Sequence, residues 1–220
     1  MSALTPPPVA AYLTGLTRAS HPVLDRIRDE GHAHGVPIVD TLTGALLHAL
    51  TRSSAATRVL EIGTAIGYST VWMATALPPT GLLVTLERDH ARATTARGYI
   101  REAGVDDRVN VMIGDASRYL HKLAGPFDLI FQDGDKTQYE PMLDTLVGLL
   151  RPGGLLITDN VLWSGEVVPG FVAAPREHAA DTAAIAAYNE RLAADPRLTT
   201  TWLPVGDGVA IAIKNRESVA

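Results

Sequence analysis

The feature that most constrains the fold is an alternation of short apolar runs with helical stretches along the middle of the chain. The apolar runs occupy residues 58–63, 82–87, 109–113, 127–131 and 155–158. Strands that alternate with helices form right-handed β-α-β units and a parallel sheet. Because the runs are apolar almost throughout, we expect helices to cover both faces of that sheet. The chain is therefore predicted to be an α/β protein.

The C-terminal part departs from this alternation. A helix near residues 181–194 is followed by two strand-like runs, 199–203 and 209–213, with the turn-rich segment PVGDG between them. This pattern predicts an antiparallel hairpin at the edge of the sheet. Together with the five earlier runs, it gives a seven-stranded, mostly parallel sheet.

The N-terminal part is predicted to be helical. Helical stretches lie at about residues 9–17, 22–34 and 39–51. The third has one apolar face, formed at helical spacing by Leu42, Ala45, Leu46, Ala49 and Leu50. We expect one domain over residues 1–220, in which N-terminal helices (1–52) precede an α/β core (53–215).

Composition excludes several classes of function. The chain has 220 residues, enough for one domain, and a formal net charge of -5 without a basic stripe, so we expect no nucleic-acid partner. It has no cysteine, which excludes disulfides and a cysteine nucleophile. We expect no signal peptide in residues 1–18 and no membrane-spanning segment, and we therefore expect a cytoplasmic protein.

A glycine-containing segment, EIGTAIGYS at residues 61–69, follows the first predicted strand. Glycines allow a tight turn and a close ligand approach, and the next helix offers free N–H groups to an anion. The same pattern also occurs in a plain strand-to-helix turn. A dinucleotide motif counted from Gly63 would place Ala65 at its second glycine and Tyr68 at its last. The bulk of Tyr68 argues against close packing around a pyrophosphate.

Acidic residues end the next two strands. Glu87 ends the second strand, where a carboxylate can accept hydrogen bonds from both ribose hydroxyls or can be a solvated charge. Asp115 follows the third strand, where it can hold an adenine edge or cap the next helix. Open α/β sheets bind ligands beyond the carboxyl ends of their strands, so both residues lie where a nucleotide-like cofactor is expected.

Oxygen donors follow the fourth and fifth predicted strands. Asp133 comes after the fourth strand, and Asp159 and Asn160 come at the end of the fifth. If these strands are neighbours, the three side chains converge and suit Mg²⁺, which prefers oxygen ligands. Asp159 and Asn160 reach one ion only if the chain turns there. They could instead form a helix cap or turn, and Asp133 could pair with Lys136.

Lys136 is a candidate general base three residues after Asp133. Its amine could take a proton from an acceptor hydroxyl if desolvation or nearby positive charge lowers its pKa. A metal ion supplies such a charge and also acidifies a bound hydroxyl. As a plain surface lysine, Lys136 would have no catalytic role.

Four blocks together make the chain resemble the metal-dependent O-methyltransferases of the caffeoyl-CoA and catechol type. The blocks are LEIGTAIGYS (60–69), FDLIFQDGDKTQY (127–139), LRPGGLLITDNVLWSGEV (150–167) and DPRLTTTWLPVGDGVAIAIK (195–214). The resemblance covers about residues 22–214, and four blocks in order are far more specific than any one of them. It implies a Rossmann-like class I methyltransferase fold, with S-adenosylmethionine as methyl donor.

The resemblance also implies roles for residues at matching positions. It implies a phenolic hydroxyl of a catechol-like small molecule as acceptor, a general base at Lys136 and a chain that often dimerises. The metal, Mg²⁺ or another divalent cation such as Mn²⁺ or Ca²⁺, would be held by Asp133, Asp159 and Asn160. With the two acidic candidates above, the predicted cofactor-binding residues are Val39, Glu61, Gly63, Thr64, Ser69, Glu87, Asp115, Ala116 and Asp135.

Some features depart from the family pattern or leave alternatives open. Gln132 and Gly134 replace an aliphatic residue and an alanine beside Asp133, and residues 167–177 have no clear match and could form a lid. We expect Trp72 and Trp202 in the core. An NAD(P)-dependent oxidoreductase with the same sheet, or a non-catalytic S-adenosylmethionine-binding protein, are the competing functions.

Overall fold

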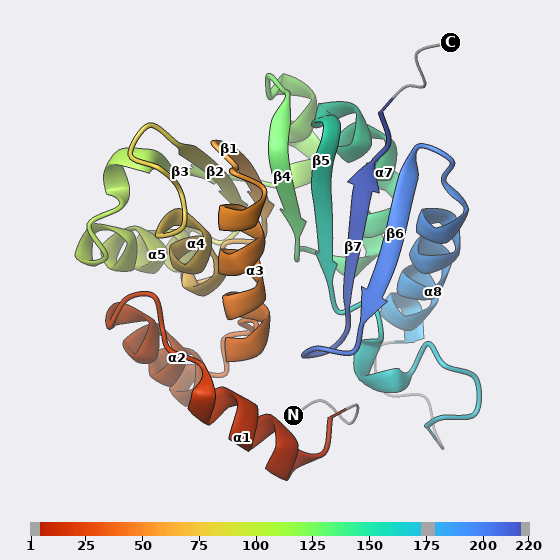
Figure 1. Ribbon diagram of the computed structural model, residues 1–220, viewed down its shortest axis with the longest axis horizontal. Helices are drawn as coiled ribbons and strands as arrows, with labels where there is room; N and C mark the ends of the chain where they lie inside the picture. Colours follow the sequence, from red (N-terminus) through yellow and green to blue (C-terminus); the bar gives the residue numbers. More distant parts are fainter. Residues whose placement is uncertain (1–4, 173–178, 217–220) are drawn as a thin grey trace.

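The predicted strands form a single seven-stranded sheet. The computed structural model describes residues 5–172 and 179–216. The strands lie in the order β3-β2-β1-β4-β5-β7-β6 (Figure 1). Their bounds are β1 Arg58–Ile62, β2 Leu82–Glu87, β3 Val109–Ile113, β4 Phe127–Gln132, β5 Leu150–Asp159, β6 Leu198–Leu203 and β7 Val209–Lys214.

The directions of the strands confirm the predicted topology. Strands β1 to β5 pair in parallel, while β7 is antiparallel to both β5 and β6. The C-terminal hairpin therefore joins the sheet next to β5, with β6 at the edge. Strand β5 begins at Leu150, earlier than predicted, because Leu150 pairs with Phe127 before a shift in register. The carboxyl ends of β1 to β5 meet at one edge, and that edge holds the site.

Helices cover both faces of the sheet, as predicted. One face packs against α2 (Val23–His34), α3 (Thr41–Ser53), α4 (Tyr68–Ala74) and α5 (His90–Glu102), and the other against α6 (Ala116–Tyr119), α7 (Tyr139–Leu149) and α8 (Ala179–Ala194). Successive strand residues point to opposite faces, so Val59 belongs to the first core and Leu60 to the second. Burial of each such side chain contributes about 1.5–3 kcal/mol. Short 3-10 helices are η1 Asp106–Arg108, η2 Leu120–Lys122, η3 Lys136–Gln138 and η4 Trp163–Gly165.

The apolar face predicted for α3 packs against the core through Ala45, Leu46 and Leu50, which are partly buried, while the fully buried residues lie beside them. The helix itself is confirmed, and its fully buried residues are Thr43, Gly44, Leu47 and Thr51. A Cβ at Gly44 would come within 2.4 Å of the indole nitrogen of Trp72 on α4. The absence of a side chain there lets α3 and α4 approach closely.

The N-terminal helix α1 (Pro7–Leu16) has no buried residue. Figure 1 shows α1 on the side of the sheet toward which β4 and β5 point. Its large exposed apolar side chains are Val9, Tyr12, Leu13 and Leu16. Within residues 5–172 and 179–216, no helix is both long and apolar enough to cross a membrane.

The two tryptophans predicted for the core have different surroundings. Trp72 is buried as predicted, with 1% of its surface exposed, whereas the prediction for Trp202 is wrong because 38% is exposed. Trp202 lies on the edge strand β6, which has a neighbouring strand on one side only. Of the predicted lid over residues 167–177, the part from residue 173 onward lies outside the described residues.

Candidate active site

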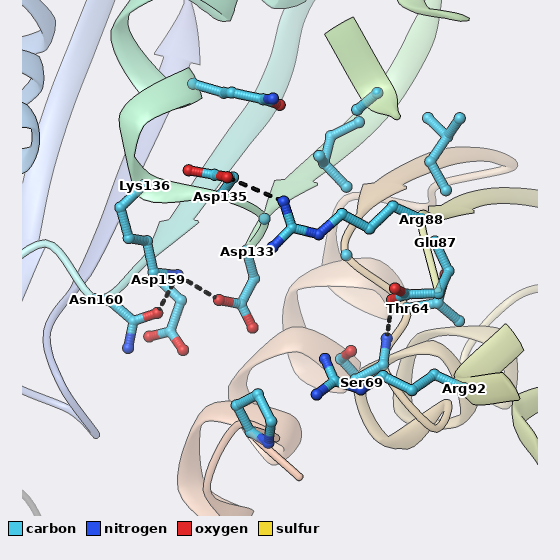
Figure 2. A pocket seen from close by; sticks show the side chains of 18 of the residues that line it. Thr64, Ser69, Glu87, Arg88, Arg92, Asp133, Asp135, Lys136, Asp159 and Asn160 are labelled. Atoms are coloured by element: carbon cyan, nitrogen blue, oxygen red, sulfur yellow. Dashed lines mark hydrogen bonds and ion pairs between the residues drawn. The ribbon is translucent and has the colours of Figure 1, made fainter. Parts of the chain in front are cut away.

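A cavity of about 630 Å³ lies at the carboxyl ends of the parallel strands. Figure 2 shows side chains entering it from the ends of β1, β2, β4 and β5. All the predicted site residues line this cavity except Glu61. Val39, ahead of α3, and Ala116, at the start of α6, are the two that contribute apolar surface.

The segment after β1 turns sharply on its two glycines. Gly63 has a φ of 97° and Gly67 a φ of 92°, a backbone conformation that residues other than glycine rarely adopt. The turn is closed by the Gly67 N–H, which donates to the Thr64 carbonyl oxygen at 2.8 Å. Thr64 is buried, and its hydroxyl lies 2.5 Å from that of Thr85 on β2. The predicted glycine turn therefore exists and forms one wall of the cavity.

Glu61 has a different place from the one predicted for it. Its carboxylate points into the protein and accepts hydrogen bonds from the hydroxyls of Ser69, at 2.6 Å, and Thr70, at 2.5 Å. Burial raises the pKa of Glu61 to about 7, although these hydrogen bonds act in the opposite direction. Glu61 does not line the cavity, but its partner Ser69, at the start of α4, does.

Glu87, at the end of β2, is hydrogen-bonded to the glycine turn. Its carboxylate oxygens accept hydrogen bonds from the N–H groups of Ala65, at 2.8 Å, and Asp89, at 2.9 Å. A carboxylate offers about four acceptor positions, so capacity remains for ligand hydroxyls in the cavity. This place matches the position predicted to bind a ribose.

Asp115 and Asp135 both cap short helices at the cavity wall. Asp115 accepts hydrogen bonds from the N–H and hydroxyl of Ser117, so the capping alternative is confirmed, although Asp115 also faces the cavity. Asp135 accepts from the N–H and hydroxyl of Thr137 and pairs with Arg88 at 3.0 Å. The hydrogen bonds from Thr137 and the Arg88 guanidinium hold the pKa of Asp135 below its usual value.

Asp133, Asp159 and Asn160 converge because β4 and β5 are neighbours, as predicted. Figure 2 shows Asp133 and Asn160 pointing toward the Lys136 ammonium. The Lys136 Nζ lies 2.9 Å from Asp133 Oδ1 and 2.6 Å from Asn160 Oδ1. Asn160 has a φ of 61°, so the chain turns after Asp159, and both residues line the cavity. The condition set for a shared ion is therefore met.

The chemistry of this oxygen set suits a divalent cation. Asp159 is 4% exposed, and its Oδ1 has no hydrogen-bond partner among the described residues. Burial, and then the nearby Asp133 carboxylate, raise the pKa of Asp159 well above its usual value. An acceptor oxygen buried beside a second carboxylate is costly unless a positive charge compensates it. Within the described ranges no group of three or more His, Cys, Asp or Glu side chains is placed to hold a metal ion, and the candidate set here has two carboxylates and one amide.

Lys136 is a partly buried lysine, with 12% of its side chain exposed, rather than a free surface lysine. Burial alone would lower the pKa of its ammonium, but the Asp133 carboxylate and the Tyr139 hydroxyl outweigh burial and raise that pKa. The Tyr139 Oη accepts a hydrogen bond from Nζ at 2.8 Å. A neutral amine was the condition stated for a general base. These neighbours by themselves favour the ammonium form, and the base role stays a prediction.

Some cavity residues were not predicted from the sequence. Tyr68, Arg88 and Arg92 line the cavity. Each lies within a few residues of a predicted site residue, and this proximity was the only signal in the sequence. Asp207, in the turn between β6 and β7, contacts Asn160 and Ser164. Burial raises the pKa of Asp207, while these hydrogen bonds act to lower it.

Comparison with known proteins identifies similar sequences and folds. A family profile described as O-methyltransferase matches residues 16–215. The chain is 39% identical over 179 residues to a catechol O-methyltransferase of Niastella koreensis, covering 77% of this chain and 79% of that protein. It is 34% identical to a caffeoyl-CoA O-methyltransferase of Eucalyptus gunnii over 80% of this chain and 73% of that one. The structure of an O-methyltransferase from Bacillus cereus in complex with SAH superposes with a TM-score of 0.82 at 32% identity, covering 94% and 97% of the two chains.

Proposed function

Because this chain belongs to the O-methyltransferase family, we propose that it methylates a phenolic hydroxyl of a catechol-like small molecule with the help of a divalent cation. The methyl donor of the family is S-adenosylmethionine. An NAD(P)-dependent oxidoreductase is not favoured, since the similar proteins described above are methyltransferases.

One observation carries the proposal. The oxygen set of Asp133, Asp159 and Asn160 opens into the same cavity as the glycine turn at Gly63. A cofactor bound at the turn and an acceptor bound at the oxygen set would therefore meet in one space. Methyl transfer by direct displacement needs such a meeting, because the attacking oxygen must lie in line with the sulfonium methyl group.

The cofactor would occupy the end of the cavity near β1 and β2. There the Glu87 carboxylate would accept hydrogen bonds from the ribose hydroxyls. Asp115 and Ala116 would flank the adenine, and Ser69 and Asp135 would bind polar atoms of the methionine part. The turn at Gly63 leaves room for the cofactor to approach the backbone.

The acceptor would lie beside the oxygen set. Asp133, Asp159 and Asn160 would hold Mg²⁺, Mn²⁺ or Ca²⁺, and the chemistry that such a cation supplies is charge stabilisation and acidification of a neighbouring hydroxyl. Trp163 lines the cavity next to this set, and its backbone N–H donates to the Asn160 carbonyl oxygen at 3.2 Å. An indole at this place offers a flat apolar surface to an aromatic acceptor.

Lys136 would receive the proton of the reacting hydroxyl at its Nζ. This role requires that positive charge beside Asp133 offsets the carboxylate that now raises the Lys136 pKa. The partly buried position of Lys136 and its three hydrogen bonds hold Nζ in place, so the lysine would not need to reorganise during the reaction.

The test is a methylation assay with S-adenosylmethionine, a panel of vicinal diphenols that includes simple catechols and caffeoyl-CoA, and either Mg²⁺ or EDTA. Mass spectrometry would detect S-adenosylhomocysteine and the methylated product. We expect methylation of at least one diol with Mg²⁺ and none with EDTA. Full activity in EDTA would refute the metal role. Cofactor binding without turnover of any diol would favour a non-catalytic binding protein.

The exposed apolar side chains of α1 support a second part of the proposal, that two copies of the chain form a homodimer. Val9, Tyr12, Leu13 and Leu16 lie on one short helix without a buried residue. A second copy that packs on this helix would remove these side chains from water.

A further inference from the structure

Asp207 lies in the turn between β6 and β7, far along the chain from the other site residues, yet contacts the loop that carries Asn160. Its Oδ2 accepts a hydrogen bond from Asn160 Nδ2 at 3.4 Å. Its Oδ1 accepts a short hydrogen bond from the N–H of Ser164. The two carboxylate oxygens therefore serve two different donors, and one of these belongs to a candidate metal ligand.

The amide of Asn160 must face one way to ligate a cation. Rotation by half a turn exchanges its oxygen and its nitrogen, and only the oxygen is a ligand. The Lys136 ammonium can only donate, so it favours Oδ1 on its side, at 2.6 Å. An ionised carboxylate can only accept, so Asp207 favours Nδ2 on the opposite side. Both neighbours select the same orientation, with the oxygen directed toward Asp133 and Lys136.

The β6–β7 turn also holds the backbone of the Asn160 loop. The Leu162 N–H donates to the Asp207 carbonyl oxygen at 3.0 Å, and the Val161 N–H donates to the Gly208 carbonyl oxygen at 3.1 Å. A Cβ at Gly208 would come within 2.5 Å of the Leu162 side chain, so the two segments touch directly. In this loop Asn160, Trp163 and Ser164 all have positive φ values, a conformation that needs such support.

We propose that Asp207 is a positioning residue that orients Asn160 as a metal ligand, keeping the amide oxygen directed at the cation and the nitrogen away from it. This inference rests on the proposed function, because it assumes a divalent cation at Asp133, Asp159 and Asn160. Asp207 does not line the cavity, so it would act on a bound cation through Asn160.

Replacement of Asp207 by asparagine isolates this role with almost no change of shape. The introduced amide would have one acceptor oxygen for the two donors that Asp207 serves. If that oxygen keeps the Ser164 N–H, the new amide nitrogen faces Asn160 and favours the flipped amide, with nitrogen toward the cation. Substitution of a residue that hydrogen-bonds to a metal ligand typically lowers metal affinity by about 10–100-fold. We therefore expect Asp207→Asn to weaken Mn²⁺ binding by about tenfold or more.

A double substitution distinguishes an effect of Asp207 on the orientation of the Asn160 amide from a general effect on the stability of the loop that carries Asn160. In Asn160→Asp with Asp207→Asn, the new carboxylate presents an oxygen to the cation in either orientation and accepts from the new amide. We therefore expect this exchange, which preserves net charge, to recover most of the lost affinity. Asp107→Asn is the matched control, because Asp107 lies in η1 with 67% of its side chain exposed.

The experiment measures Mn²⁺ binding by electron paramagnetic resonance and S-adenosylmethionine binding by calorimetry, without any assay of turnover. Weakened Mn²⁺ binding in Asp207→Asn, with cofactor affinity unchanged and recovery in the exchange, would support the inference. Unchanged Mn²⁺ affinity in Asp207→Asn would overturn it, as would equal losses of metal and cofactor binding without recovery. If the unsubstituted protein binds no Mn²⁺, the proposed metal site fails, and the inference fails with it.

Discussion

A Cβ at Gly63 would lie 2.3 Å from the backbone carbonyl oxygen of Asp133. Gly63 follows β1 and Asp133 follows β4, and these two strands are neighbours in the sheet. The turn of the proposed cofactor site and the first proposed metal ligand thus meet backbone to backbone. An alanine cannot fit there unless one of the two segments moves.

Gly63→Ala is therefore expected to damage both halves of the site. The positive φ of 97° and the contact with a carbonyl oxygen should together cost at least about 2 kcal/mol of unfolding free energy. Calorimetry should show S-adenosylmethionine binding weakened more than tenfold. The control is Gly98→Ala in α5, where nothing lies within 4 Å of the added Cβ. The unfolding free energy of Gly98→Ala should rise by about 0.5–1 kcal/mol. A Gly63→Ala variant as stable as the original protein would contradict the prediction.

Asp159→Ala should separate the metal site from the cofactor site. It removes a buried carboxylate whose Oδ1 lacks a partner among the described residues, so the fold should lose little. We expect loss of measurable Mn²⁺ binding and of EDTA-sensitive turnover, with cofactor affinity within about threefold of the original. Unimpaired Mn²⁺ binding in this variant would show that Asp159 is not a ligand.

Two substitutions of Lys136 distinguish a base from a fixed positive charge. Lys136→Ala should lower kcat by about 10²–10⁴-fold, the range typical of a lost general base, with a smaller effect on the acceptor KM. Lys136→Arg keeps the charge but cannot be deprotonated near neutral pH. If Lys136 acts as a base, Arg should be as slow as Ala, whereas substantial activity in the Arg variant would point to charge stabilisation.

Glu61 should make stability fall as pH rises. Its folded pKa of about 7 is above the ordinary value of 4.5, so the protonated form is favoured in the fold. The associated stability is present below pH 4.5 and is lost as pH rises through 7. Relative to Glu61→Gln, the original protein should lose about 3 kcal/mol between about pH 4.5 and 8. Urea unfolding at several pH values measures this difference, and parallel curves for the two proteins would refute it.

Leu16→Asp tests the proposed homodimer. The Leu16 side chain is exposed in one copy of the chain, so the substitution should leave the fold intact. Light scattering should give twice the chain mass for the original protein and a single chain mass for the variant. A monomeric original protein would exclude the dimer at the concentration measured.

The positions of the strands along the chain could be predicted from the sequence because each strand has a strong local pattern. Glu87 and Asp159 were located correctly because they end apolar runs at the edge where such sheets bind ligands. The prediction that Asp133 and Asn160 converge needed only the adjacency of β4 and β5, which the sheet order confirms.

Features that depend on contacts between distant segments could not be predicted. The close approach of α3 to α4 at Gly44 and Trp72 is one of them, because apolar periodicity carries no information on that contact. Glu61 looked like a ligand because of its place beside Gly63, but its orientation depends on two hydroxyls of the following helix. Asp207 looked like a turn residue, since its partner Asn160 is remote in sequence.

The position of β7 has a consequence for how the protein is made. Although β7 follows β6 in the sequence, it is an interior strand of the sheet, between β5 and β6. During synthesis β5 therefore has an unpaired edge until β7 leaves the ribosome, and open strand edges can pair with other chains. The same event brings the turn with Asp207 against Asn160, so the site is completed only when synthesis of the sheet is complete.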